Sequence, residues 1–490
     1  MQNLQKPLQK KNSEPISGNI SEQNSEKNAL GSLNNYQTSW DLYLILGAVG
    51  IFAIAALLHF WQLGTVPYPI FDEVLFGKYA EEYLDGNPTW EGHPPLGKFF
   101  IMLGILIFGR NEIGYRLLSA CFGSIAPLLL IGLVYRLTHK RNFALLSGLF
   151  LCSDGLFLVE SRTGLLNIFL VSFGITSQIF LVAALEQKGK LRTWLLCCAG
   201  LMLGASTSVK WNGLGFSLLV FLVVSLVWII AKFFPKNLAK LGIFREITTL
   251  YWWQYILGFV LAPLAFYLVQ WLPLFILNPG GVAPETGLGA IHSFWESLVR
   301  VQNHIIWWHN TAEMISTPEH PSHPYCSTVI SWPVLARTVG YYFQDRDGYF
   351  TVMQGLGNPI LWWFSTIAIV FITITSLLPK FQKFSNIGSN NYLLLGYFAN
   401  YAPWLLVKRC LFVYHYLSSA AFSFVALAWI VSQMLDRKGI VSYLGYVIIA
   451  LVLLSQIFFL PIWIGLPVSH SAFYERMWFM PDSVPGFNWI

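Results

Sequence analysis

Charged residues are scarce in this sequence of 490 residues. Asp, Glu, Lys and Arg make up only 11% of the chain, against about 25% in soluble proteins, whereas 55% of the residues are hydrophobic and the mean hydropathy is +0.55. Since so few charges cannot keep a surface in contact with water, we exclude a soluble globular protein and predict a polytopic membrane protein. The apolar runs are about 18 to 22 residues long, which is typical of transmembrane helices, and the short alternating strands of a transmembrane β-barrel are missing.

The sequence also lacks a disulfide pattern and a basic region of the kind that binds nucleic acid. Most of its six cysteines lie in or beside apolar runs and none shows metal-ligand spacing, so we interpret them as buried thiols without a disulfide framework. The net charge of +6 comes from Lys and Arg in short loops between apolar runs, and we predict no nucleic-acid partner. No cleavable signal peptide is expected, and residues 1–40, rich in Gln, Asn, Ser and Lys, are predicted to form a disordered cytoplasmic tail.

About eleven apolar segments have the length of a membrane span. They lie near residues 42–60, 115–134, 143–159, 165–185, 193–208, 212–231, 253–277, 359–378, 391–407, 412–434 and 441–464. The segment 96–108 is also apolar, but with about 13 residues it suits a helix in the membrane interface better than a span. If the N-terminus lies inside, every short inner loop is basic and the inner side holds 18 of the 30 Lys and Arg, as the positive-inside rule requires. A span at 96–108 would break this agreement at every later loop.

This topology predicts an all-α multi-pass protein of the cell membrane with a cytoplasmic N-terminus and an outer C-terminus. Its parts are the tail over 1–40, a transmembrane module over 41–277 with an outer loop at 61–112, a long outer loop over 278–358, a four-helix module over 359–464 and an outer tail over 465–490. In the first outer loop, apolar side chains at helical spacing predict an amphipathic helix over 71–83. The long outer loop exceeds a plain connection, so we expect local helices in it.

The first outer loop carries the ionisable residues that we single out for chemistry. Asp72 and Glu73 are adjacent at the start of the predicted helix, so their carboxylates project differently and can serve as a base and a partner carboxylate. The alternative is helix capping, since Asp is a good N-cap and Glu in the first turn suits the helix dipole. The segment HPPLGK adds His93 and Lys98 as candidate binding residues; the alternative is a structural turn with a lysine that extends to the headgroups.

Further cations lie at the outer ends of several predicted helical hairpins. Because charges at the edge of a span are costly and usually functional, we expect them to form an anion site, and arginine suits phosphate. The candidates are Arg116, Arg162, Lys210 with its neighbour Trp211, Lys408, Arg409, and then His415 and Tyr416. The alternatives are extension to the headgroups, pairing of Arg162 with Glu160, a core position for His415 and an interfacial position for Tyr416.

Six motifs follow one another along residues 42–435: FDE…HPPLGK, GYRLLSACFGS, LVESRTGLLN, STSVKWNGLG, GNPILWW and YAPWLLVKRCLFVYHYLSSA. In this order they resemble the protein O-mannosyltransferases, a family of the GT-C superfamily of glycosyltransferases that use polyprenyl-phosphate sugars. The resemblance implies a GT-C fold of about eleven transmembrane helices, with interfacial helices in the first outer loop. It implies transfer of mannose from polyprenyl-phosphate mannose to Ser or Thr hydroxyls of proteins. It also implies that Asp72 is the base, that Glu73 helps to hold acceptor or sugar, and that Arg162 lies at the lipid phosphate.

Two features depart from the family. Asn167 stands in LLN where members often have LLD, which removes a carboxylate, and the long outer loop has no MIR repeats, so the chain resembles a bacterial type of member. The implied partners are the donor lipid, a Ser/Thr-containing acceptor protein with the secretion translocon as a candidate meeting place, and membrane lipids. No cofactor is required, and a divalent metal is not indicated because the histidines of the long loop fit no ligand spacing.

One base is enough for the implied reaction, because phosphate is a good leaving group that needs no general acid. Attack of the acceptor oxygen opposite the phosphate inverts the configuration at the anomeric carbon. The nearest alternative is a GT-C transferase that moves the sugar to a lipid or glycan. A membrane transporter is the alternative from another class, but it predicts inverted repeats and charges near the middle of the bilayer, and the sequence shows neither.

Overall fold

The computed structural model describes residues 42–490 apart from 88–91, 278–287, 311–322, 379–386 and 482. The predicted tail at 1–40 lies outside the described residues. All that follows concerns the unit Leu42–Ile490, which is separate from Met1–Asp41.

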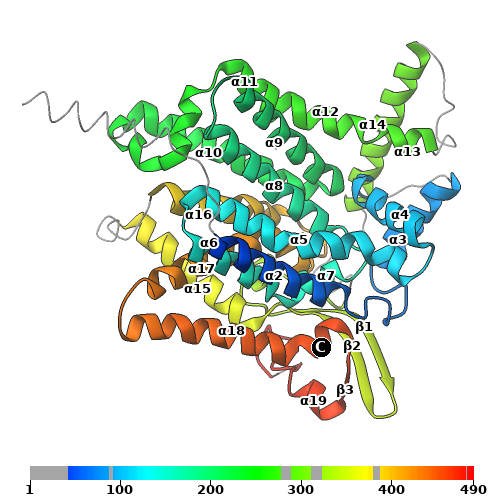
Figure 1. The fold of residues 1–490 in the computed structure, drawn as a ribbon. Coiled ribbons are helices and arrows are strands. Elements are labelled where there is room, and N and C mark those ends of the chain that lie inside the picture. Colours follow the sequence, from blue (N-terminus) through cyan, green and yellow to red (C-terminus); the bar gives the residue numbers. More distant parts are fainter. Residues whose placement is uncertain (1–41, 88–91, 278–287, 311–322, 379–386, 482) are drawn as a thin grey trace, which may run out of the picture. The chain divides into compact units, whose positions relative to one another are not determined.

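The described residues are mostly helical (Figure 1). The helices of the first half are α2 (Leu42–Phe60), α3 (Glu73–Asp85), α4 (Leu96–Phe108), α5 (Glu112–Thr138), α6 (Arg141–Cys152), α7 (Gly155–Ser161), α8 (Asn167–Leu185), α9 (Gly189–Val209) and α10 (Leu214–Phe233). Those of the second half are α11 (Trp252–Ile256), α12 (Ala262–Val269), α13 (Leu272–Leu277), α14 (Leu288–Asn310), α15 (Pro359–Leu377), α16 (Ile387–Tyr401), α17 (Leu417–Leu435), α18 (Ile440–Ile464) and α19 (His470–Tyr474).

The long apolar helices follow the predicted spans. Within the described residues, eight helical segments are long and apolar enough to cross a membrane. The pair α6 and α7, bent by 63° at a short break, makes a ninth if the two helices together form one span. Helices α9 and α16 occupy two further predicted spans, so the total of about eleven stays a prediction. Helix α4 covers the predicted residues 96–108, and it is a shorter apolar helix, as an interfacial position requires.

The break between α6 and α7 has a local cause. The Asp154 side chain caps α7 by accepting a hydrogen bond from the Phe157 backbone N–H. The same carboxylate accepts from the backbone N–H of Asn358 at 2.9 Å and from the Trp362 indole at 2.6 Å. Because Asn358 in turn caps α15, these bonds tie the start of the second transmembrane module to α7.

Glycine residues end the two helices of the first outer loop. Helix α3 stops at Gly86, which has φ 68°, and α4 stops at Gly109, which has φ 85°. Both conformations are left-handed, where a side chain would be strained. The chain can therefore turn back twice within a short loop and bring α3 and α4 into contact.

A small antiparallel sheet accompanies the helices. Strands β1 (Val339–Arg346) and β2 (Tyr349–Gly355) form a hairpin, and β3 (Pro467–Ser469) pairs with β2, in the order β1-β2-β3. The hairpin turns at Asp347-Gly348, both with positive φ, as a two-residue hairpin loop favours. The sequence predicts local helices in the long outer loop, and α14 is one, but the hairpin is an addition to the predicted all-α class.

The interpretation of all six cysteines as free thiols is wrong for two of them. Cys326 and Cys410 form a disulfide with their Cα atoms 5.2 Å apart, across 84 residues of sequence. Both lie outside the transmembrane helices, on segments that the fold brings together, whereas Cys152, a free thiol, is buried among helices. Disulfides persist in oxidising compartments, so this bond agrees with an outer position for its segments.

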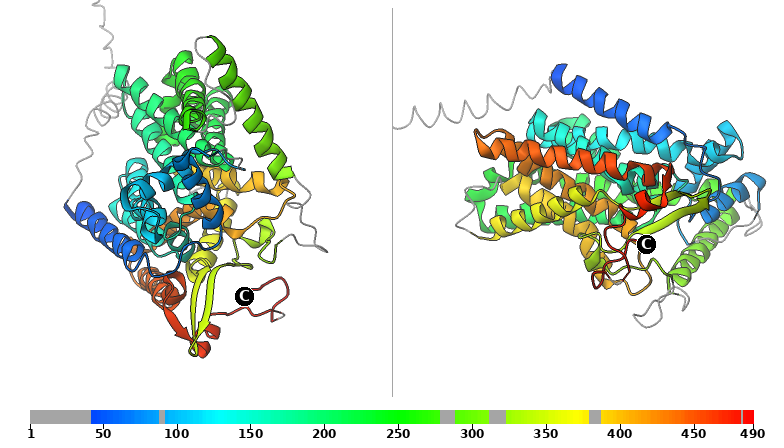
Figure 2. Two further views of the ribbon diagram at one scale, coloured as in Figure 1. Left: turned by 90° about the vertical axis from the view of Figure 1, so that its right-hand side faces the viewer. Right: turned by 90° about the horizontal axis from the view of Figure 1, so that it is seen from below.

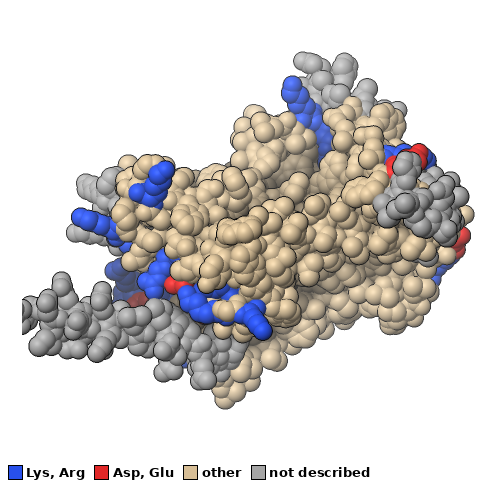
Figure 3. Space-filling model, turned by 90° about the horizontal axis from the view of Figure 1, so that it is seen from above, with Lys and Arg blue, Asp and Glu red and all other residues tan. Residues whose placement is uncertain are grey.

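The most buried of the span-length helices are α8 and α17, so they form the centre of the bundle. Helix α8 packs against α5 and α9, and α17 packs against α6, α15 and α16. Outer helices expose large apolar side chains such as Leu46, Phe221 and Ile457. In Figure 3, most of the visible Lys and Arg lie toward the left of the view, a few lie at its upper and right-hand edges, and a wide central area carries no charged side chain, which suits contact with lipid.

The segments predicted to be outer loops gather at one end. Helices α3, α4 and α14 and the hairpin of β1 and β2 lie at the right-hand side of Figure 1, and the right-hand view of Figure 2, seen from below, agrees. The loop from the first half of the chain and the loop from the second half therefore share one end of the bundle. This end contains the candidate site.

Candidate active site

A cavity of about 720 Å³ opens between segments that are far apart in sequence. Its walls come from the loop before α4, the start of α10, the end of α14, and the stretch from α16 to His415. Its polar lining residues are His93, Lys210, Asn212, His309, Asn310, Asn400, Lys408, Arg409 and His415. Its apolar lining residues include Trp211, Leu214, Leu218, Ala399, Pro403, Trp404, Leu406 and Val407.

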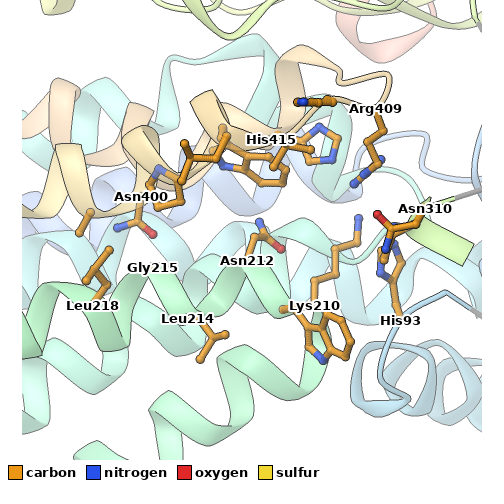
Figure 4. Close-up of a pocket in the computed structure, with 18 residues that line it drawn as sticks. His93, Lys210, Asn212, Leu214, Gly215, Leu218, Asn310, Asn400, Arg409 and His415 are labelled. Atoms are coloured by element: carbon orange, nitrogen blue, oxygen red, sulfur yellow. The ribbon is translucent and has the colours of Figure 1, made fainter. Parts of the chain in front are cut away.

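The two cations lie at one end of the cavity, and Leu214 and Leu218 lie toward the other, where Asn400 is also found (Figure 4). Lys210 and Arg409 point toward one another from opposite walls, beside His93 and Asn310. Leu214 and Leu218 lie on α10 at the other end, where α10 packs against α16. The cavity therefore combines a cationic end with an apolar channel along a transmembrane helix.

Lys210 and Arg409 are the cations of this cavity that lie away from bulk water. Lys210 follows the last residue of α9 and is buried, and Arg409 is half-buried. Burial lowers the pKa of Lys210 to about 8, against the opposing effect of the carboxylates of Glu160 and Asp72. Among the described residues neither cation forms an ion pair with a carboxylate, so both can bind an anion.

Asp72 lies beside these cations. It directly precedes α3, but its side chain makes no capping hydrogen bond, so helix capping does not explain its presence. Its carboxylate instead accepts a hydrogen bond from the Tyr414 hydroxyl. Burial raises the pKa of Asp72, while the positive charges of Lys210 and Arg409 oppose this shift. Asp72 is thus a half-buried carboxylate next to the cationic end of the cavity.

The backbone before Asp72 has an unusual conformation. Phe71 has a positive φ of 47°, which is rare for a residue with a large side chain. Its ring packs 4.5 Å from the Tyr341 ring and 6.1 Å from the Tyr414 ring, measured between centroids. These contacts fix the turn that directs Asp72 toward Tyr414.

Glu73 points away from the cavity and pairs with Arg116. The two Arg116 nitrogens lie 2.7 and 2.8 Å from the two Glu73 carboxylate oxygens, and both side chains are buried. Glu73 also accepts backbone N–H bonds from Ile70 at 3.0 Å and Gly164 at 2.7 Å, and Arg116 donates to the Val66 carbonyl at 2.6 Å. The pair therefore holds the loop around Asp72 and does not reach the cavity.

Arg162 also lies elsewhere than the resemblance implies. Its guanidinium donates to the carbonyls of Leu58 at 2.6 Å and Trp61 at 2.8 Å, at the C-terminal end of α2. It does not line the cavity. The alternative of an ion pair with Glu160 is wrong as well, because the Glu160 carboxylate accepts hydrogen bonds from Tyr341 and Asn167.

The segment HPPLGK forms a fixed turn. The Lys98 ammonium donates to the carbonyls of His93 at 2.8 Å and Pro94 at 2.6 Å, and it is buried, so it neither extends to the headgroups nor lines the cavity. At Gly97 a Cβ would lie 2.8 Å from Leu166, so glycine lets α4 approach the bundle closely. The turn places the His93 ring in the cavity wall, 5.2 Å from the ring of His309.

Of three further residues predicted for the site, two line the cavity and one lies in the core. Trp211 lines the cavity and donates to the Tyr267 hydroxyl at 2.9 Å. His415 lines it too, with its ring 4.5 Å from the Trp404 ring. Tyr416 is a core residue whose hydroxyl donates to Tyr397, so it neither lines the cavity nor has the interfacial position of the alternative.

Several residues of the site are missed by the sequence. His309 and Asn310 end α14, and their polar side chains in a long loop carry no signal for a cavity wall. They reach it because Tyr267, which Trp211 contacts, donates to Gln302 of α14 at 2.7 Å. Tyr414, the partner of Asp72, lies inside a motif already singled out, so proximity to His415 is the signal that could have found it.

Comparison with known families agrees with this arrangement. A model described as dolichyl-phosphate-mannose-protein mannosyltransferase matches residues 49–111 and 104–277. A model of the C-terminal four-transmembrane region of protein-O-mannosyltransferase matches residues 294–482. The chain belongs to the protein O-mannosyltransferase family.

Curated relatives match almost the whole chain. A polyprenol-phosphate-mannose–protein mannosyltransferase of Mycolicibacterium smegmatis is 26% identical over 87% of this chain and 91% of its own length. The protein of the same description from Corynebacterium glutamicum is 24% identical over 84% of this chain and 88% of its own length. The family is thus one of glycosyltransferases that act on proteins.

Solved structures show the same fold. The protein O-mannosyltransferase Pmt1-Pmt2 complex of S. cerevisiae, bound to the sugar donor, superposes with a TM-score of 0.75 at 16% identity, over 94% of this chain and 95% of the other. ArnT of Cupriavidus metallidurans, bound to undecaprenyl phosphate, gives a TM-score of 0.52 at 12% identity, over 83% and 63% of the two chains. These neighbours identify the fold as GT-C.

Proposed function

We propose that this protein transfers mannose from polyprenyl-phosphate mannose to Ser or Thr hydroxyls of proteins at the outer face of the membrane, with Asp72 as the base. The observation that supports this most is the cavity: two cations that form no ion pair within the described residues face each other at one end, an apolar channel forms the other, and a carboxylate adjoins the cations. An amphipathic lipid with one phosphate has the same division of charge.

The donor phosphate lies between Lys210 and Arg409 in this proposal. The planar guanidinium of Arg409 can donate two parallel hydrogen bonds to phosphate, and the Lys210 ammonium adds a point charge. The polyprenyl chain then follows the apolar residues of the channel, from Leu214 to Leu218 along α10. These residues lie on a span-length helix, so the chain can continue into the bilayer.

The reaction needs one proton acceptor. The acceptor oxygen attacks the anomeric carbon, the bond from that carbon to the phosphate oxygen breaks, and the hydroxyl proton passes to Asp72. The leaving polyprenyl phosphate takes the bonding electron pair, and Lys210 and Arg409 stabilise the charge that grows on it. Because attack comes opposite the phosphate, the configuration inverts.

Other residues of the site have supporting roles. Glu73 with Arg116, and Arg162, are positioning residues that hold the loop around Asp72 and the end of α2. Burial keeps the pKa of His93 well below its ordinary value and lowers that of His309 to about 4, so both rings are neutral at pH 7. Neutral imidazoles can donate and accept hydrogen bonds to sugar hydroxyls.

The outer orientation is part of the proposal. The Cys326–Cys410 disulfide adjoins Arg409, and a disulfide is stable on the oxidising side of a membrane. Proteins emerge unfolded on that side at the secretion translocon, where their Ser and Thr side chains are accessible. A membrane-impermeant thiol reagent tests the orientation. Single cysteines are introduced into the loop after α5 and at the C-terminus, and only the C-terminal cysteine should react from outside in intact cells.

Label transfer tests the function. Purified protein in nanodiscs is given polyprenyl-phosphate mannose with a radioactive sugar and a Ser/Thr-rich peptide. The proposal expects label on the peptide. Transfer of the label to a lipid or glycan other than the donor, without labelled peptide, would assign another acceptor. No turnover of this donor by folded protein would overturn the proposed function.

A further inference from the structure

A chain of buried polar side chains connects Lys210 to a carboxylate that lies outside the cavity. The Lys210 ammonium donates to Asn167 Oδ1 at 3.1 Å, and Asn167 Nδ2 donates to Glu160 Oε2 at 2.8 Å. The other Glu160 oxygen accepts from the Tyr341 hydroxyl. All four side chains are buried, and they come from α7, α8, β1 and the end of α9.

The two ends of the Asn167 amide have different partners for a chemical reason. Only its oxygen can accept from the Lys210 ammonium, and only its nitrogen can donate to the Glu160 carboxylate. The amide therefore separates a cation from an anion that would otherwise pair. Glu160 offsets the charge of Lys210 from a distance, and the lysine keeps its remaining N–H donors for another partner.

We propose that Glu160 is a positioning residue for the transfer reaction, acting on Lys210 through the side-chain amide of Asn167. This inference rests on the proposed function, because it assigns to the donor phosphate the Lys210 donors that do not bond Asn167; the ammonium also lies 5.4 and 5.6 Å from the ring centroids of Phe76 and Tyr414. The uncharged amide of Asn167 holds the Lys210 ammonium close to Asp72 without forming an ion pair with that ammonium. A carboxylate at position 167 would pair with Lys210 directly and would compete with the phosphate.

The environment of Lys210 sets the pH response. The titratable groups around it are the acids Glu160 and Asp72, the cations Arg409 and Lys98, the histidines His93, His309 and His415, and Tyr414. The histidines are neutral above pH 7, so the two carboxylates are the groups that favour a charged lysine there. Removing the Glu160 charge therefore lowers the pKa of Lys210, and a carboxylate at position 167 raises it.

The test measures binding of undecaprenyl phosphate by tryptophan fluorescence between pH 6.5 and 10, since Trp211 and Trp404 line the cavity. In Glu160→Gln, binding should be lost at a pH about one unit lower than in wild type. In Asn167→Asp, binding at pH 7 should weaken by more than about fivefold, because a carboxylate then lies beside the ligand. Glu186→Gln is the control: its carboxylate pairs with Arg136 at another site, so binding should not change.

The double variant Glu160→Gln/Asn167→Asp is decisive. It has the net charge of wild type and differs only in which side chain carries the carboxylate. The inference expects it to bind undecaprenyl phosphate more than about fivefold more weakly than wild type. Equal binding would show that the amide is not needed, and an unchanged pH dependence in Glu160→Gln would show that Glu160 does not act on Lys210; either result overturns the inference. Since binding is measured without transfer, failure of the proposed reaction would be seen separately, as absence of labelled peptide in wild type.

Discussion

Replacing Arg409 by Ala should weaken donor binding strongly and leave acceptor binding nearly unchanged. Arg409 faces Lys210 across the cavity and carries no ion pair among the described residues, so a phosphate is its natural partner. A hydrogen bond to a charged group contributes about 1.5 to 3 kcal/mol. Arg409 is half-buried, so we take the lower value for each of two bonds, which gives about 3 kcal/mol and a rise of about a hundredfold in the donor dissociation constant.

A series at position 409 separates charge from geometry. Arg409→Lys keeps the charge but loses the fork of two donors, so a rise of only about tenfold is expected. Lys408→Ala is the matched control, because Lys408 is exposed and lines the same cavity; water screens its charge, and a change below about threefold is expected.

The assay is titration with undecaprenyl phosphate, followed by steady-state kinetics at varied donor and varied peptide. A rise in the KM for peptide with an unchanged KM for donor would refute the phosphate role of Arg409. So would equal losses in Lys408→Ala and Arg409→Ala, since they would point to general attraction by surface charge.

Three further predictions follow from the described contacts. Glu73→Gln leaves the Arg116 guanidinium buried without its counter-ion, which should cost about 3 to 5 kcal/mol of stability and lower the temperature at which the protein aggregates in heated detergent extracts, whereas unchanged stability would contradict the buried pair. Burial raises the pKa of Asp72, so the rate of transfer should fall as the pH drops through a value above that of an ordinary aspartate, and a rate that is constant down to pH 4 would exclude Asp72 as the base. Reduction of the Cys326–Cys410 bond should raise the KM for donor in wild type and have no further effect in the Cys326→Ser/Cys410→Ser variant, while an effect of reductant on that variant would show another target.

The sequence predicts the helices well because hydropathy acts locally. The segments 42–60 and 96–108 coincide with α2 and α4, because in each case the helix begins and ends at the same residues as the apolar run. The predicted outer loop also contains the turn with His93 that lines the cavity. Motif order adds the family, which hydropathy alone does not provide.

The roles of the arginines could not be separated by sequence. Arg116, Arg162 and Arg409 all lie near the ends of apolar segments, and all three resemble anion-binding residues. Arg116 and Arg162 bind backbone carbonyls about 50 and 100 residues away in the chain, so most of their donors are used within the fold, although Arg162 Nε has no hydrogen-bond partner among the described residues. Only the tertiary structure shows that Arg409 lines the cavity, where the one hydrogen bond recorded for it among the described residues goes to the Cys410 carbonyl at 3.3 Å.

The same cause explains why the sequence predicts neither the disulfide nor the hairpin. Cys326 and Cys410 are 84 residues apart and become neighbours only when the long outer loop folds over the end of the bundle. The turn Asp347-Gly348 is a local hairpin signal, but it lies in a long loop for which the length alone led to the prediction of helices. Contacts between distant segments thus account for most of what the sequence does not predict.

The central claim is that Asp72 accepts the proton of the attacking hydroxyl beside a bound donor. The most direct test is single-turnover transfer from polyprenyl-phosphate mannose to a Ser/Thr peptide, with wild type and Asp72→Asn compared in the same nanodiscs and donor binding measured for both. We expect Asp72→Asn to bind the donor as wild type does and to transfer mannose at least about a hundredfold more slowly. Transfer by Asp72→Asn at the wild-type rate would contradict the account.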